Sequence, residues 1–416
     1  MKEVLKTTLT VIFLIIFLTG NDLLAQTDNP VRTSKPNTLR IIELKGNGFE
    51  QGVQHGRKLR NEIEQVFIKW KSNIRNAIKG DPDSVITSFL KSSNFETITR
   101  KYTPWLLKEI MGISEGSGQK FKDVLAFQLV DEFWVYLDQQ FNASNHHCSS
   151  VGVPKAENHP AYLAQNIDLE NYKNGFQVLF HIAASETEPE QFILSCAGLV
   201  AINGMNEKGI GICINSLMEL AASPDGLPVA FIVRGVLNKQ TGSEALSFLK
   251  SVKHASGQNY ILGIPDSIYD FEASSNQVIR FLPTKRQNQT VYHTNHALAN
   301  HDVKDWYKDY HLKVLAGLTK NNNSEVRFAT LEKYFDKPSN QISSSIIKKV
   351  FRSKEDPGNP VCRGYSEGAY GFTFSSVIFT LSGRQSVQVT CGPPNQSEYK
   401  EYFFRNLTLN NHVTRH

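Results

Sequence analysis

The sequence Asn145-His146-His147-Cys148-Ser149-Ser150 stands where the chain changes from a mostly helical first third to a mostly β remainder. A strand-like run follows it, and residues 162–168 (YLAQNID) form a second such run that ends in the carboxylate of Asp168. This layout is typical of a nucleophile at the start of a strand, with polar support from the neighbouring strand. A single cysteine is more often a small buried residue or half of a disulfide, so the rest of the chain must decide between these interpretations.

The composition is typical of a globular protein with an ordinary core. The chain has 416 residues, of which 40% are hydrophobic and 20% charged, enough for one large domain or two ordinary ones. The formal net charge is +5 and the basic residues are spread out, so no nucleic-acid surface is predicted. A mean hydropathy of −0.32 argues against a protein with several membrane-spanning helices.

Residues 1–25 have the features of a signal peptide. Two lysines precede an apolar run at residues 9–18, and Ala25 supplies a small residue at the expected cleavage site. An apolar core of about ten residues is too short to cross a bilayer of about 30 Å as a helix. Residues 26–37 are polar and contain two prolines, which predicts a disordered lead-in. We therefore expect an exported protein without a stable membrane span.

The five cysteines are odd in number and scattered, so they do not form a disulfide framework. At least one must be free or pair between chains. No CxxC pair or His/Cys cluster has zinc spacing, and His146, His147 and Cys148 would alternate between the faces of a strand. Neither a metal nor a cofactor is predicted, and a homo-oligomer is left open.

Hydrophobic periodicity predicts helices in the first third of the chain, at residues 49–77, 84–90, 104–113 and 121–137. Strands are predicted at residues 38–44, 149–153, 162–166, 177–183, 191–196, 199–203, 210–215, 259–264, 268–273 and 277–282. The remaining predicted elements are helices at 228–237, 242–252 and 302–335 (broken at 321–323) and a strand hairpin at 372–381 and 385–390. This order indicates layered α and β structure in one domain.

Eight short segments between residues 40 and 404 are informative because of the order in which they occur. They are residues 49–56 (FEQGVQHG), 108–116 (KEIMGISEG), 165–168 (QNID), 204–209 (GMNEKG), 293–296 (HTNH), 362–365 (CRGY), 372–381 (FTFSSVIFTL) and 392–394 (GPP). Each alone is a weak signal. Together they resemble the cysteine-type N-terminal-nucleophile (Ntn) hydrolases of the acyl-CoA:6-aminopenicillanate (isopenicillin-N) acyltransferase family, whose His-Thr-Asn-His motif is matched outright.

The resemblance implies an α+β fold, a four-layer αββα sandwich, as a single domain at residues 38–416. It also implies self-cleavage before the nucleophile Cys148, which would give chains 26–147 and 148–416. The family usually has glycine before the nucleophile, where this chain has His147.

The resemblance also implies roles for four residues. Cleavage would free an α-amine on Cys148 with an unperturbed pKa of about 8, close to the thiol's value of about 8.5, so the amine can relay the proton. Asn295 is the candidate donor to the tetrahedral oxyanion, because an amide donates without charge. Asp168 would accept from the new ammonium or orient the cysteine, and Arg363 would hold Asp168 or a substrate carboxylate. The alternative for Asp168 is a carboxylate in a β-turn or facing solvent, and the alternative for Arg363 is a surface salt bridge.

The predicted function is an exported amidohydrolase that cleaves the C–N amide bond of a small N-acyl compound through a Cys148 acyl-enzyme. Hydrolysis is preferred over transfer because acyl-CoA is an intracellular metabolite and water is always present. Three alternatives stay open: an acyltransferase that passes the acyl group to an amine, a non-catalytic ligand-binding protein if the His147–Cys148 bond stays intact, and a cysteine protease with His293 or His296 as base.

Overall fold

The computed structural model describes residues 38–141, 147–282, 290–319 and 322–405. Residues from Thr38 onward form one compact unit. The predicted signal peptide and lead-in, and also Asn145 and His146, lie outside the described residues.

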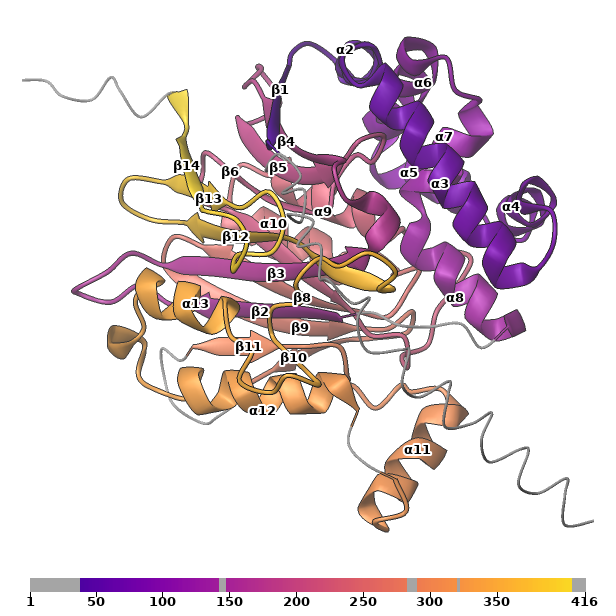
Figure 1. Ribbon diagram of the computed structural model, residues 1–416. Coiled ribbons are helices and arrows are strands. Elements are labelled where there is room, and N and C mark those ends of the chain that lie inside the picture. The colour runs from indigo at the N-terminus through magenta and orange to yellow at the C-terminus, as the bar shows by residue number, and fades with distance from the viewer. Residues whose placement is uncertain (1–37, 142–146, 283–289, 320–321, 406–416) are drawn as a thin grey trace, which may run out of the picture. The chain divides into compact units, whose positions relative to one another are not determined.

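Two sheets form the centre of this unit (Figure 1). The eight-stranded sheet has the order β1 (Arg40–Leu44), β4 (Gln177–Ile182), β5 (Gln191–Cys196), β6 (Asn203–Asn206), β7 (Gly211–Ser216), β8 (Gln258–Ile264), β9 (Ser267–Ala273) and β10 (Val278–Phe281). The six-stranded sheet has the order β11 (Val291–His293), β2 (His147–Val153), β3 (Tyr162–Glu170), β12 (Gly371–Thr380), β13 (Ser386–Val389) and β14 (Lys400–Phe403). All neighbouring strands are antiparallel except β1 and β4, which are parallel.

The helices fall into two groups along the chain. The first group is α2 (Gly48–Lys58), α3 (Arg60–Ile78), α4 (Pro82–Lys91), α5 (Phe95–Tyr102), α6 (Pro104–Ser117), α7 (Phe121–Gln128) and α8 (Val130–Phe141). The second group is α9 (Val229–Leu237), α10 (Gly242–Ser251), α11 (Asp305–Leu315), α12 (Asn323–Phe335) and α13 (Ser344–Phe351). No helix in the described ranges has both the length and the apolar character needed to cross a membrane.

The sheets and helices stack in four layers. Strands β2 and β3 pack against β7 and β8, α9 packs on β6 and β7, and α12 and α13 pack on β2, β3 and β11 (Figure 1). The order is therefore helix, sheet, sheet, helix, and the predicted α+β fold with an αββα sandwich is confirmed.

Strand β2 contributes to both hydrophobic cores. Val151 and Val153 are buried in the core beneath α12 and α13. Gly152 points the other way, where a Cβ would lie 2.4 Å from Cγ2 of Ile268 in the eight-stranded sheet. Side chains of a strand alternate between its faces, so odd-numbered residues of β2 face the helices and even-numbered residues face the opposite sheet.

Helices α2 and α6 cross at a contact made by glycines. A Cβ on Gly52 would lie 2.0 Å from the backbone oxygen of Glu109, and one on Gly112 would lie 2.2 Å from a backbone oxygen of α2. Only glycine lets two helix backbones approach this closely. Two of the family-like motifs, at residues 49–56 and 108–116, therefore serve helix packing.

Three predicted elements differ from the structure. The helix predicted at 49–77 is divided at Leu59 into α2 and α3, and the helix predicted at 121–137 is divided at Leu129 into α7 and α8. Both leucines are buried, so the apolar stripe continues through each break and the periodicity does not reveal it. The strand predicted at 199–203 is wrong: a turn at Gly198 (φ +89°) leads into irregular chain, and β6 begins only at Asn203.

We predict that Gly52→Ala lowers the free energy of unfolding by about 3 kcal/mol, because the added methyl group must separate α2 from α6. Gly80→Ala is the control, since a Cβ there has its nearest neighbour at 3.7 Å; it should change stability by less than about 0.5 kcal/mol. Urea denaturation of both variants measures the difference. Equal stabilities would contradict the packing role of Gly52.

Candidate active site

Cys148 lies near the start of β2, immediately after His147. The antiparallel pairing of β2 with β3 places His147 opposite Asp168. Cys148 shares its strand face with Ser150, whose Oγ donates to Asn215 Oδ1 of β7 at 2.5 Å. The thiol of Cys148 therefore points into the layer between the two sheets, where it packs against the main hydrophobic core.

The thiol of Cys148 is not activated by its surroundings. Burial, together with the negative charge of Asp168, raises the pKa of the thiol to about 12, although a backbone hydrogen bond from Asp168 and the positive charge of Arg327 act in the opposite direction. A thiol with this pKa is neutral at physiological pH and is a poor nucleophile. Catalysis by Cys148 thus requires a base that takes its proton.

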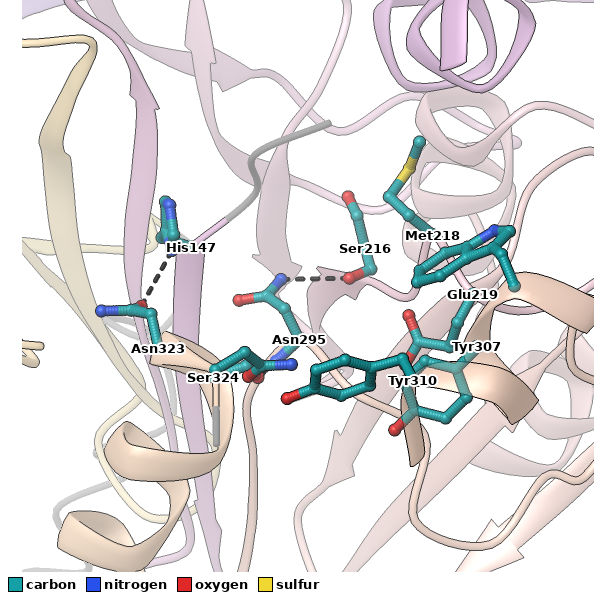
Figure 2. Close-up of a pocket in the computed structure, with 11 residues that line it drawn as sticks. His147, Ser216, Met218, Glu219, Asn295, Tyr307, Tyr310, Asn323 and Ser324 are labelled. Atoms are coloured by element: carbon teal, nitrogen blue, oxygen red, sulfur yellow. Dashed lines mark hydrogen bonds between the residues drawn. The ribbon is translucent and has the colours of Figure 1, made fainter. Parts of the chain in front are cut away.

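Asn295 contacts the backbone nitrogen of Cys148. Its Oδ1 accepts the Cys148 N–H at 2.5 Å and an Nη2–H of Arg327 at 2.9 Å. Its Nδ2 donates to the carbonyl oxygen of Ser216 at 3.1 Å, as Figure 2 shows. Two donors at Oδ1 fix the orientation of the amide, and the second hydrogen on Nδ2 remains for another acceptor.

His293 anchors the loop that carries Asn295. Its Nε2 donates to Glu272 at 2.9 Å and its Nδ1 donates to the carbonyl of Thr294 at 2.9 Å. Burial alone lowers the pKa of His293, but the carboxylates of Asp270 and Glu272 outweigh it and raise the pKa to about 9. The ring is therefore positively charged at neutral pH and has no lone pair with which to accept a proton.

His296 is neutral, unlike His293, and it also holds the loop that carries Asn295. Its Nδ1 hydrogen-bonds Ser324 Oγ at 2.8 Å, and the same Oγ accepts the backbone N–H of Asn295 at 2.6 Å. Burial and the positive charges of His293 and Arg327 lower the pKa of His296 to about 3, so its ring is neutral. Ser324, at the start of α12, thus fixes the loop from the helical side.

Asp168 and Arg363, two further predicted site residues, lie together. Asp168 Oδ2 is 3.7 Å from Arg363 Nε, and Asp168 Oδ1 accepts a hydrogen bond from Thr373 Oγ1 at 2.7 Å. Thr373 Oγ1 in turn accepts the Arg363 backbone N–H at 2.9 Å. Burial raises the pKa of Asp168 to about 6 although Arg363 and Thr373 favour the charged form. The carboxylate is thus ionised above about pH 6 and lies beside the start of β2.

Arg327 of α12 is a site residue that the sequence interpretation missed. It is only 1% exposed, and its guanidinium donates to the carbonyl of Cys148, to Ser149 Oγ (2.9 Å) and to Asn295 Oδ1. Burial lowers its pKa to about 10, so it keeps its charge at neutral pH. Arg327 therefore orients both partners of the Cys148–Asn295 contact. A signal existed in the sequence, because Arg327 lies on the same helical stripe as the buried Leu331.

Other residues of the motifs have structural tasks. Gln165 bridges the sheets through its contacts with Ile214 and Asn203, and Asn166 donates to two carbonyls beneath α13. Asn206 closes the turn of the β6–β7 hairpin by accepting the Ile210 N–H. These contacts explain why the motifs contain amide side chains besides that of Asn295.

Two cavities border the Cys148–Asn295 contact. The inner cavity, of about 50 Å³, lies between the sheets and is lined by Cys148 and mostly apolar side chains. The outer cavity, of about 310 Å³, is lined by Asn295, His147 and aromatic side chains of α11 (Figure 2). In the part of the chain that the structure describes, no group of three or more His, Cys, Asp or Glu side chains could hold a metal ion.

The stacked sheets between helical layers, with a cysteine at the start of an inner strand, define an Ntn-hydrolase fold. A model of the acyl-coenzyme A:6-aminopenicillanic acid acyl-transferase family matches residues 155–396, which is more than half of the chain. The chain belongs to this family. The matched range contains Asp168, Asn295 and Arg363 and begins just after Cys148. The family, the fold and an Ntn-type enzyme that acts on amides, all predicted from the sequence, are thereby confirmed.

The chain is similar over most of its length to the acyl-coenzyme A:6-aminopenicillanic-acid-acyltransferase 40 kDa form of Emericella nidulans. The two sequences are 21% identical over 370 residues, which cover 88% of this chain and 96% of the relative. Among solved structures, an N-acylethanolamine-hydrolyzing acid amidase ortholog of Caenorhabditis elegans is 13% identical with a TM-score of 0.38, covering 57% of this chain and 94% of that one. A mutant of the conjugated bile acid hydrolase of Clostridium perfringens is 13% identical with a TM-score of 0.35, covering 64% of this chain and 99% of that one.

The charge of His293 predicts a pH dependence of stability. Its folded-state pKa of about 9 lies above the ordinary value of 6.5, so its contribution is fully present below pH 6.5 and is lost as the pH rises through about 9. We expect this contribution to be about 3 kcal/mol. The melting temperature of the wild type should therefore fall more steeply between pH 6.5 and 9.5 than that of His293→Gln.

The exposed His301 provides the control, because His301→Gln should follow the wild-type curve. Parallel curves for the wild type and His293→Gln would show that His293 is not charged in the folded protein.

Proposed function

We propose that this protein is an exported amidohydrolase that cleaves the C–N amide bond of a small N-acyl compound through an acyl-enzyme on Cys148. One observation carries the proposal: the Cys148 backbone nitrogen is held by Asn295 while the thiol of the same residue points into an adjoining cavity. A nucleophile and an amine on one residue are the arrangement that N-terminal-nucleophile catalysis requires.

The reaction begins with proton transfer within Cys148. Once the chain is cleaved before Cys148, its free α-amine, with an ordinary pKa of about 8, takes the thiol proton. The thiolate then attacks the amide carbon, and the negative charge that develops on the carbonyl oxygen needs a preorganised donor. The remaining hydrogen on Asn295 Nδ2 can supply that donor. The C–N bond breaks as the α-ammonium returns its proton to the leaving nitrogen, and water then hydrolyses the thioester.

The histidines support this interpretation over that of a cysteine protease. A Cys/His pair needs a neutral imidazole that accepts the thiol proton. His293 donates from both nitrogens, and the pKa of His296, lowered to about 3, makes that ring a very weak base. Neither ring is suited to the role, whereas an α-amine on Cys148 is.

His147 stands where the family usually has glycine. It lies in β2, and Lys79 is the only non-glycine residue in the described ranges with a positive φ. The ring of His147 forms a hydrogen bond through Nδ1 with Asn323 Oδ1 of α12 at 2.9 Å. We infer that this side chain does not prevent attack of Cys148 on the preceding carbonyl.

A transferase is the second candidate, because the Emericella nidulans relative is named as an acyltransferase. It would form the same acyl-enzyme and differ only in the acceptor, an amine instead of water. We favour hydrolysis because the signal-like sequence at residues 1–25 points to export, away from intracellular acyl-CoA.

We predict that the protein made in an exporting host has two new N-termini, Gln26 and Cys148. Cys148→Ala should abolish the second terminus, whereas Cys391→Ala, which changes another thiol, should leave it. The two chains should stay associated, because the buried ion pair between Glu109 of α6 and Arg234 of α9 joins them at 2.9 Å. Intact mass and N-terminal sequencing test this, and an active wild type that remains a single chain would overturn it.

We predict that Asn295→Ala lowers kcat by about 10² to 10³, as expected for loss of one oxyanion donor, while KM changes much less. Asn295→Asp separates two roles of the side chain. It keeps an acceptor for Arg327 and the α-amine but removes the Nδ2 donor, so it should be at least as harmful if donation to the oxyanion matters.

His293→Ala and His296→Ala are the comparison variants, and both should chiefly lower the melting temperature. Steady-state kinetics with any cleaved amide distinguish a catalytic role of Asn295 from a catalytic role of either histidine. If either histidine variant loses more kcat than Asn295→Ala at an unchanged melting temperature, the assignment of catalytic roles is wrong.

A further inference from the structure

The two cavities at the active site are related to the nucleophile in different ways. Cys148 lines the inner cavity, into which its thiol points. The outer cavity is lined instead by Asn295, which holds the Cys148 nitrogen at 2.5 Å. The thiol thus borders the inner cavity, whereas the residue that holds the Cys148 nitrogen borders the outer cavity, and Ser216 lines both.

This separation orients a bound amide. The carbonyl carbon must reach the thiol, and the leaving nitrogen must take its proton from the α-amine of Cys148. The acyl chain is then directed into the inner cavity and the amine part into the outer cavity. The reverse orientation would place the leaving nitrogen on the far side of the sulfur, away from the proton donor.

We propose that the substrate is the amide of a short, apolar acyl group, which occupies the inner cavity, and a bulky aromatic amine, which occupies the outer cavity. This inference rests on the proposed amidohydrolase function and specifies its substrate.

The inner cavity limits the length of the acyl group. One water needs about 10–15 Å³ of such space, so about 50 Å³ holds a chain of roughly two to four carbons. Its walls include Ile167 of β3, Ile214 of β7, Val229 of α9, and Leu199 and Ile202 of the irregular chain before β6. These side chains are well packed, so a longer chain requires them to move.

The charged groups at the inner cavity are already engaged. Lys173 Nζ donates to Glu170 at 2.7 Å, and Asp168 lies beside Arg363. Asp131 accepts hydrogen bonds from Ser216 Oγ at 2.6 Å and from Gln258 at 2.8 Å. A polar acyl group would compete with these contacts, so an apolar acyl group is favoured.

The outer cavity suits a flat aromatic amine. Trp306, Tyr307 and Tyr310 of α11 line it, with ring centroids 5.7 and 5.9 Å apart along the series. Trp306 is 47% exposed, so it has surface available for stacking on a ligand. The described lining contains one carboxyl group, Glu219, and no lysine or arginine, which disfavours an anionic amine.

The test uses aminocoumarin amides with acetyl, butanoyl, octanoyl and hexadecanoyl groups, and the same acyl series on ethanolamine. The wild type should show the highest kcat/KM with acetyl or butanoyl aminocoumarin, and a value lower by about tenfold or more with octanoyl. Ile202→Ala should raise kcat/KM for the octanoyl amide about tenfold. Ile193→Ala, a buried isoleucine of β5 outside the cavity, should not change the acyl preference.

Variants of α11 test the amine side. Trp306→Ala should raise KM for the aminocoumarin amides about tenfold and leave KM for the ethanolamides unchanged. Leu312→Ala, an exposed change on the same helix away from the cavity, is the control.

The outcomes separate this inference from the function on which it rests. A preference for octanoyl or hexadecanoyl amides, or an equal effect of Trp306→Ala on both amines, overturns the substrate inference and leaves the amidohydrolase function standing. The same holds if Cys148 is exposed as an N-terminus but no short-chain aromatic amide is cleaved. If Cys148 is not exposed and neither series is cleaved, the proposed function itself fails.

Discussion

The hydrogen bond between the Cys148 backbone nitrogen and Asn295 Oδ1 connects the start of β2 with the loop that follows β11, and much of the surrounding structure keeps its two ends in place. The N–H is positioned by the pairing of β2 with β3. The acceptor is positioned by Ser216 on one side and by Ser324 and Arg327 of α12 on the other. In the proposed mechanism, cleavage before Cys148 would free this nitrogen as an amine that Asn295 already holds, which is the physical meaning of a preorganised site.

Buried charges hold this region together and also make its stability depend on every hydrogen-bond partner. Arg327 and His293 are cations with little or no exposed surface, and each is surrounded by acceptors. Glu272 accepts the His293 ring N–H and the backbone N–H groups of Leu298, Ala299 and Asn300, which lowers its pKa in spite of burial. Desolvation of such groups is costly unless every partner is present. These contacts hold the loop with Asn295 in place, and the proposed role of Asn295 as an oxyanion donor needs a fixed side chain.

The motifs that identify the family divide into two kinds. Cys148, Asp168 and Asn295 meet around the start of β2, where chemistry can take place. The glycines of the α2–α6 contact and Asn206 in its hairpin turn have packing tasks at other places, and Gln165 joins the two sheets beside the inner cavity. A sequence motif alone does not distinguish these kinds, since a close backbone contact can require one residue type as strictly as a catalytic step does.

The sequence by itself determined the elements whose signals are local. The two-residue period marked most strands, turn residues marked the hairpin of β12 and β13, and the ordered motifs identified the family, the αββα fold and four candidate site residues. The tertiary structure alone decided where the long amphipathic stretches break, because Leu59 and Leu129 are buried like their neighbours. It also decided that Asn295 meets Cys148 across 147 positions of chain and that Arg327 joins them. Such contacts depend on how the sheets and α12 stack, and periodicity marks which face of an element is buried without showing which residues that face meets.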